Sequence, residues 1–171
     1  MSILSVENLS LKIGTENILG GISFRLDQGR ILAITGESGS GKSMTALSII
    51  QLQPKNAKLE GEIFFDDQEI TKKAEFELCK IRGAKIGMIF QEPMTALNPV
   101  KTVGDQISET IILHSTKNKK SADKETLKIL ERVGLSPAAE VKKRYPHELS
   151  GGQRQRAVSY THLTLPTIYS V

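Results

Sequence analysis

The segment from Gly36 to Ser43 is suited to binding the phosphate groups of a nucleotide, because it matches the pattern G-x-x-x-x-G-K-[ST]. Its glycines allow backbone torsions through which successive N–H groups turn toward phosphate oxygens. Lys42 would place a cation between the terminal phosphates, and the Ser43 hydroxyl is suited to ligate Mg²⁺. The predicted phosphate-binding residues are Gly36, Glu37, Ser38, Gly39, Ser40, Gly41, Lys42 and Ser43.

The stretches on either side of this loop have the residue types needed to position it. Residues 31–34 form a short apolar run, typical of a strand covered on both faces, and residues 44–50 have helical character. A helix directly after the loop adds its positive amino end to the phosphate site. An accidental match in a Gly/Ser-rich surface loop is expected at roughly the one per cent level. The flanking elements therefore favour phosphate binding, although the motif does not distinguish ATP from GTP.

A second glycine-containing segment, Leu149-Ser150-Gly151-Gly152-Gln153, opens an expected helix far downstream. Taken alone, the pattern is explained by Ser150 capping the start of that helix. Two adjacent glycines after a serine at a helix start also make an anion-binding arrangement. The presence of a phosphate loop in the same chain favours this second interpretation.

Taken in chain order, the phosphate loop, a Gln at the end of an expected strand (Phe90-Gln91) and the segment 149–153 resemble the ATP-binding subunits of ABC transporters. The resemblance covers roughly residues 1 to 158. It implies ATP and Mg²⁺ as cofactors, with Lys42 and Gln91 as catalytic residues. It also implies that Ser43 and Gln91 contact the Mg²⁺ ion.

The same resemblance implies a second ATP-binding subunit, identical to this chain or a paralogue. In the family, the downstream segment contacts the ATP held by the phosphate loop of the other subunit. Carried over to this chain, the residues that bind the partner's ATP are Ser150, Gly151, Gly152 and Gln153. The implied working unit is a head-to-tail dimer that closes on two ATP molecules.

Two further segments, residues 91–99 and 145–149, look like those of the oligopeptide, dipeptide and nickel importer branch. This likeness implies membrane permease subunits as partners and a location at the cytoplasmic face of the cell membrane. A solute-binding protein would act indirectly. The segment after Gln91 would contact the permease, and Pro93 and Pro99 bracket it as a stiff stretch. The permease and the binding protein would choose the solute, so this chain does not identify it.

The resemblance implies an α/β fold, with a P-loop NTPase core, an antiparallel β subdomain and a helical signature subdomain, incomplete at the carboxyl end. The expected division is a nucleotide-binding core over 1–91, a helical subdomain over 92–158 and a non-native tail over 159–171. Apolar patterning predicts strands over residues 3–13, 18–26, 31–34, 61–65 and 85–90, and helices over 73–81, 103–111 and 127–133.

The sequence departs from the family pattern in two places. Ile13 stands where the family usually carries an aromatic residue that stacks on adenine. No Asp, Glu, Lys or Arg follows Arg156, so the acidic strand that supplies the general base is missing, and His162 comes too early to be the switch histidine. We therefore expect an ABC-type ATPase as parent protein. This chain itself should hydrolyse ATP poorly and expose apolar faces that reduce its solubility.

Composition fits an ordinary soluble domain, with 171 residues, 39% hydrophobic, 25% charged and a net charge of +4. The single cysteine, Cys79, excludes an intrachain disulfide or a cysteine-rich zinc site. No stretch approaches the roughly 18 apolar residues of a membrane helix, so a cytoplasmic chain is expected. A solvated helical face, rather than a nucleic-acid site, explains the lysine run Lys117, Lys119, Lys120, Lys124 and Lys128.

Three other functions are less well supported. A GTPase needs an Asn-Lys-x-Asp motif, and the nearest segment, residues 118–121, lacks the Asp. A DNA-repair ATPase of the ABC type would carry a long heptad coiled coil between Lys42 and Ser150, which this sequence lacks. His147 has no second metal ligand nearby and is expected to be a polar loop histidine. A binding-only or non-transport ABC-type ATPase is the alternative that stays open.

Overall fold

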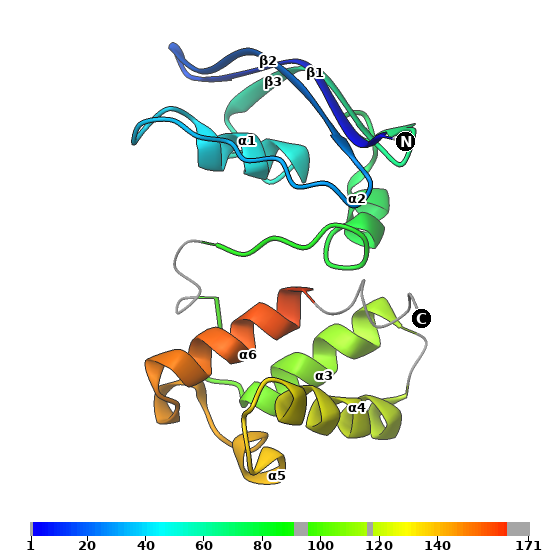
Figure 1. Ribbon diagram of the computed structural model, residues 1–171, viewed down its shortest axis with the longest axis vertical. Helices are drawn as coiled ribbons and strands as arrows, with labels where there is room; N and C mark the ends of the chain where they lie inside the picture. The colour runs from blue at the N-terminus through cyan, green and yellow to red at the C-terminus, as the bar shows by residue number, and fades with distance from the viewer. Residues whose placement is uncertain (1, 91–95, 116–117, 164–171) are drawn as a thin grey trace. The chain divides into compact units, whose positions relative to one another are not determined.

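The computed structural model describes residues 2–90, 96–115 and 118–163, and the side chains of these residues up to Val158 (Figure 1). The chain divides into two compact units, Met1–Cys79 and Lys80–Val171, and each is described by itself. Within the described ranges, no helix has the length and apolar character needed to cross a membrane.

An antiparallel sheet forms most of the first unit. Its strands are β1 (Ser2–Ile13), β2 (Glu16–Asp27), β3 (Ala57–Phe65) and β4 (Gln68–Glu69), in the order β2-β1-β3-β4. The side chains of Leu9, Leu11 and Ile63 are fully buried in its core. Strands β1, β2 and β3 confirm the predictions over residues 3–13, 18–26 and 61–65.

Two helices accompany this sheet. Helix α1 (Lys42–Ile49) confirms the helix predicted over residues 44–50 and begins two residues earlier, at Lys42 within the phosphate loop. Helix α2 (Glu75–Ile81) confirms the short helix predicted over residues 73–81 and crosses the boundary between the units. In chain order, residues 28–35, which form no strand, separate β2 from the phosphate loop, and α1 follows the loop.

The strands predicted over residues 31–34 and 85–90 are wrong for this structure. Neither segment belongs to a strand, apart from an isolated bridge between Arg82 and Ile86. Ile31 is 97% exposed, and Ile89 and Phe90 are 47% and 43% exposed. A parallel strand needs a hydrogen-bonded neighbour and cover on both faces, and no other described strand supplies either to these segments. Most of their apolar side chains therefore stay at the surface, although Ile86 and Met88 are half-buried.

Helices make up the second unit: α3 (Val103–His114), α4 (Lys119–Arg132), α5 (Ala138–Val141), a 3₁₀ helix (Pro146–Glu148) and α6 (Gly151–Leu163). Helix α3 packs against both α4 and α6 (Figure 1). The apolar positions that predicted α3 and α4 form its core, since Val103, Ile107 and Leu130 are at most 2% exposed. The helical spacings read from the sequence are confirmed.

Candidate phosphate-binding site

Gly41 gives the phosphate loop its shape at the start of α1. It is the N-cap residue of that helix, with φ 87° and ψ 5°. A Cβ at this position would lie 2.6 Å from Cδ2 of Leu19 and 3.0 Å from the carbonyl oxygen of Ile18. Both the left-handed torsion and the close approach of β2 disfavour a side chain here. Glycine therefore lets the loop turn into the helix without strain.

The first turn of α1 is fastened to the same glycine. The backbone N–H of Thr45 donates to the Gly41 carbonyl at 2.8 Å, and the Thr45 hydroxyl donates to it at 3.0 Å. Thr45 is 1% exposed, so this anchor is protected from water. The first turn of α1 contains no acidic residue, and its positive amino end is therefore available to an anion.

The side chain of Lys42 is hydrogen-bonded to the phosphate loop. Its ammonium group donates to the carbonyl oxygens of Gly36 (2.9 Å) and Glu37 (2.6 Å), and to Oγ of Ser40 (3.4 Å). The loop thus wraps around its own cation through residues six, five and two positions earlier. A phosphate oxygen would form a stronger, charge-assisted hydrogen bond with this ammonium than a neutral carbonyl does. The arrangement suits the predicted role of Lys42.

The surroundings of Lys42 fit a nucleotide phosphate with Mg²⁺. Residues 36–40 and Ser43 are exposed, so the backbone N–H groups and the Ser43 hydroxyl can be reached from solvent. The described residues contain no group of three His, Cys, Asp or Glu side chains that could hold a metal ion alone. In phosphate loops of this pattern the Ser or Thr hydroxyl is one of the ligands that hold Mg²⁺ beside the nucleotide phosphates, and Ser43 stands at that position. Gln91, the other predicted metal contact, lies outside the described residues.

The predicted second segment forms the start of α6 in the other unit. The Ser150 hydroxyl accepts the backbone N–H of Gln153 at 3.3 Å, and Oε1 of Gln153 accepts the backbone N–H of Ser150 at 3.0 Å. This reciprocal pair is a capping box, which the S-x-x-Q spacing could have predicted. Helix capping by Ser150 is confirmed. Ser150, Gly151 and Gly152 are exposed, and their contact with a partner's ATP stays a prediction.

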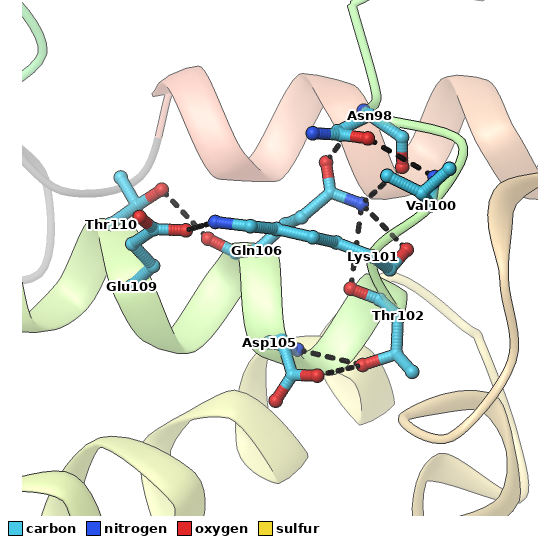
Figure 2. A network of polar contacts seen from close by, with 8 residues as sticks. All are labelled: Asn98, Val100, Lys101, Thr102, Asp105, Gln106, Glu109 and Thr110. Atoms are coloured by element: carbon cyan, nitrogen blue, oxygen red, sulfur yellow. Dashed lines mark hydrogen bonds and ion pairs between the residues drawn. The ribbon is translucent and has the colours of Figure 1, made fainter.

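The carboxyl end of the predicted permease-contact segment, residues 91–99, is held on α3 by Gln106, which sequence reasoning missed. The Asn98 N–H donates to Oε1 of Gln106 at 2.9 Å. Nε2 of Gln106 donates to the carbonyl oxygens of Asn98 (3.0 Å) and Lys101 (3.1 Å). Figure 2 shows this amide lying between the loop and the helix. Residues 91–95 lie outside the described part of the chain.

Two other singled-out residues have ordinary surroundings. His147 lies in the 3₁₀ helix, where its ring stacks on Tyr145 with centroids 5.7 Å apart. Ile13 ends β1 and pairs with Glu16 and Ala57. The assignment of Ile13 to the adenine-stacking position stays a prediction.

The family model described as ABC transporter matches residues 19–163. The chain therefore belongs to the ABC transporter family.

Within this family, the chain is similar to ATP-binding proteins of peptide transport. It is 48% identical over 140 residues to the oligopeptide transport ATP-binding protein AppD of Bacillus subtilis strain 168, covering 81% of this chain and 43% of that protein. It is 47% identical over 162 residues to the dipeptide transport ATP-binding protein DppD of the same organism, covering 91% and 48%. The chain thus spans about half the length of these relatives.

Solved structures support the fold. A dimeric ATP-binding cassette in a post-hydrolysis state, bound to ADP and Pi, superposes with a TM-score of 0.79 at 28% identity. The superposition covers 95% of this chain and 69% of that one. The chain has the α/β fold of ATP-binding cassettes, although the strands predicted at 31–34 and 85–90 are not formed.

Proposed function

We propose that the chain binds ATP with Mg²⁺ through residues 36–43, as the ATP-binding subunit of a membrane importer for peptides. The observation that carries the proposal is the arrangement around Lys42, whose ammonium is centred in a glycine-shaped loop at the amino end of α1. The identities of 47% and 48% to dipeptide and oligopeptide transport ATP-binding proteins support the solute class. ATP hydrolysis by the assembled importer would reset it after transport.

The proposed partners are a second ATP-binding subunit and the permease, with a solute-binding protein acting indirectly. A dimeric cassette among the similar structures supports the first. For the permease, the second unit offers a groove of about 340 Å³ beside α3, between Ala96 and Leu113. Leu113 is 75% exposed, and the Lys101–Glu109 ion pair (2.7 Å) lies on the groove wall. The chain would thus associate peripherally with the cytoplasmic face of the membrane.

Titration of the chain with ATP and Mg²⁺ tests the proposal. Lys42→Ala should weaken ATP binding by about 10- to 100-fold, because it removes a charge-assisted hydrogen bond worth about 1.5–3 kcal/mol. Lys55→Ala is the matched control, since Lys55 is an exposed lysine in the turns that follow α1 and precede β3. Equal affinity of wild type and Lys42→Ala would place ATP elsewhere, and the proposal would fail.

A further inference from the structure

The amino end of α3 is bonded to a distant segment of the chain. The first backbone N–H groups of any helix lack partners within the helix. In α3, the Val103 N–H donates to the carbonyl of Arg144 at 2.9 Å and the Gly104 N–H donates to the carbonyl of Lys142 at 3.0 Å. The Asp105 N–H donates to Oγ1 of Thr102 at 3.1 Å. Two of these three donors are thus satisfied by the segment 142–144.

Residue 104 must be glycine for this contact to form. A Cβ on residue 104 would lie 2.6 Å from the carbonyl oxygen of Lys142 and only 2.1 Å from its Cγ. The backbone oxygen cannot move away without breaking its hydrogen bond with the Gly104 N–H. Gly104 lies within α3 and has no left-handed torsion. Glycine is needed there because the backbone of Lys142 approaches it closely.

Lys142 is fixed from a second direction by α4. Its ammonium lies 2.8 Å from Oδ1 of Asp123, and both side chains are partly buried, with 25% and 37% of their surface exposed. The backbone of Lys142 thus contacts α3 while its side chain contacts α4. The segment that begins at residue 142 is held at its start by two helices.

The chain between Lys142 and Ser150 is short and contains a hydrogen-bonded turn. The Tyr145 N–H donates to Oε2 of Glu148 at 2.7 Å, and the Glu148 N–H donates back to the Tyr145 carbonyl at 3.0 Å. Leu149 follows and is 3% exposed. Ser150 then caps α6. Hydrogen bonds thus close the turn from Tyr145 to Leu149, and only the short stretch from Lys142 to Tyr145 separates this turn from the contact with α3.

We propose that Gly104 is a positioning residue for the segment 149–153. By admitting the carbonyl of Lys142 to the first turn of α3, it sets where the amino end of α6 points. The same helix turn carries Gln106, which holds the loop at residues 98–101, so the two segments share one support. The functional meaning rests on the proposed ATP contact of segment 149–153, whereas the positioning itself does not.

Amide hydrogen exchange of the whole chain, without nucleotide, tests this proposal. In Gly104→Ala, we expect the amides of Val103 and Gln153 to exchange roughly tenfold faster, with a smaller change at Ile129 in α4. Gly20→Ala is the matched control, because no heavy atom lies within 4 Å of the added Cβ. Because no nucleotide is used, failure of the chain to bind ATP would leave this result unchanged.

Asp123→Asn is the second variant, and it decides the question if Gly104→Ala does not fold. It loosens Lys142 without adding a side chain at residue 104, and we expect roughly threefold faster exchange at Gln153. A larger increase in the exchange rate at Gln153 than at Ile129, each relative to the wild type, supports the proposal. If Val103 alone responds, or if Gln153 and Ile129 change equally, Gly104 has only a local structural role and the proposal is overturned.

Discussion

In the phosphate loop, Lys42 and Gly41 perform separate tasks. Lys42 carries the charge and is held by the carbonyl oxygens of Gly36 and Glu37. Gly41 supplies the backbone shape. The sequence pattern predicted both residue types, but it could not show why a side chain is excluded at residue 41, because the excluding carbonyl belongs to Ile18 in β2. Such a contact depends on tertiary packing and leaves no local signature.

Gly41→Ala should weaken ATP binding and lower the free energy of unfolding of the first unit by about 1–3 kcal/mol. The added Cβ must be accommodated at a left-handed torsion and against the Ile18 carbonyl. Chemical denaturation and ATP titration measure the two effects. Gly20→Ala adds the same Cβ in open space and should leave both near wild type. Equal effects of the two substitutions would contradict this account of Gly41.

We expect the Asp123–Lys142 pair to make the stability of the second unit depend on pH. The hydrogen bond from Lys142 holds the pKa of Asp123 below its usual range, assisted by the charge of Lys119 and a hydrogen bond from Ser108. A lowered pKa means that the stabilisation is present above the unfolded-state value of about 3.9 and disappears as the pH falls through the folded-state value.

Thermal unfolding of wild type and Asp123→Asn between neutral and acidic pH measures this contribution. We expect the wild type to unfold at a higher temperature at neutral pH, with the difference shrinking below about pH 4. A difference that stayed constant down to acidic pH would show that the carboxylate charge contributes nothing.

At the level of elements, α6 begins with a cap that has two separable roles. Ser150→Ala should lower the free energy of unfolding of the second unit by about 1 kcal/mol, because the Gln153 N–H loses its acceptor. Ser150→Asp should retain the cap, since aspartate is an equally good N-cap residue. Its carboxylate would nevertheless repel the phosphates of a partner's ATP.

Thermal denaturation and ATP-dependent self-association, measured on both variants, separate these roles. We expect Ser150→Asp to be as stable as wild type and defective in association. If it associated normally with ATP, the segment 149–153 would have only the capping role.

The longer helices and antiparallel strands could be predicted from the sequence, because the burial of one face sets a repeating pattern of apolar residues in each. The short β4 and α5 contain too few residues to show such a pattern and were not predicted. Val103, Ile107 and Ile111 recur at helical spacing and are all buried. Residues 31–34 are different, since a continuous apolar run predicts burial only if other strands cover it. No described strand pairs with this segment, and Ile31 and Ile34 are 97% and 46% exposed. The apolar residues 31–34 are typical of a buried strand, but no strand in the described part of the chain covers them.

Ile31→Lys distinguishes the exposed segment of the structure from the buried strand that the sequence predicts. If Ile31 is exposed, the substitution should change the free energy of unfolding by less than about 0.5 kcal/mol and should reduce aggregation. Chemical denaturation and light scattering measure the two. Loss of the folded first unit would instead mean that Ile31 is buried in solution.

For the whole molecule, we propose that a chain of the ABC transporter family holds ATP at one defined place, the phosphate loop of the first unit. Family membership and the α/β cassette fold follow from the match over residues 19–163 and from the similar cassettes. The place follows from the loop geometry around Lys42 in the first unit. The second unit contributes the capped start of α6, which the proposed dimer would present to the partner's ATP.

Hydrogen exchange of the chain with and without ATP and Mg²⁺ reports where on the chain the nucleotide binds. We expect slower exchange of backbone amides over residues 36–43 in the wild type and no such protection in Lys42→Ala. Protection of another segment, or equal protection in the Lys42→Ala variant, would contradict this proposal.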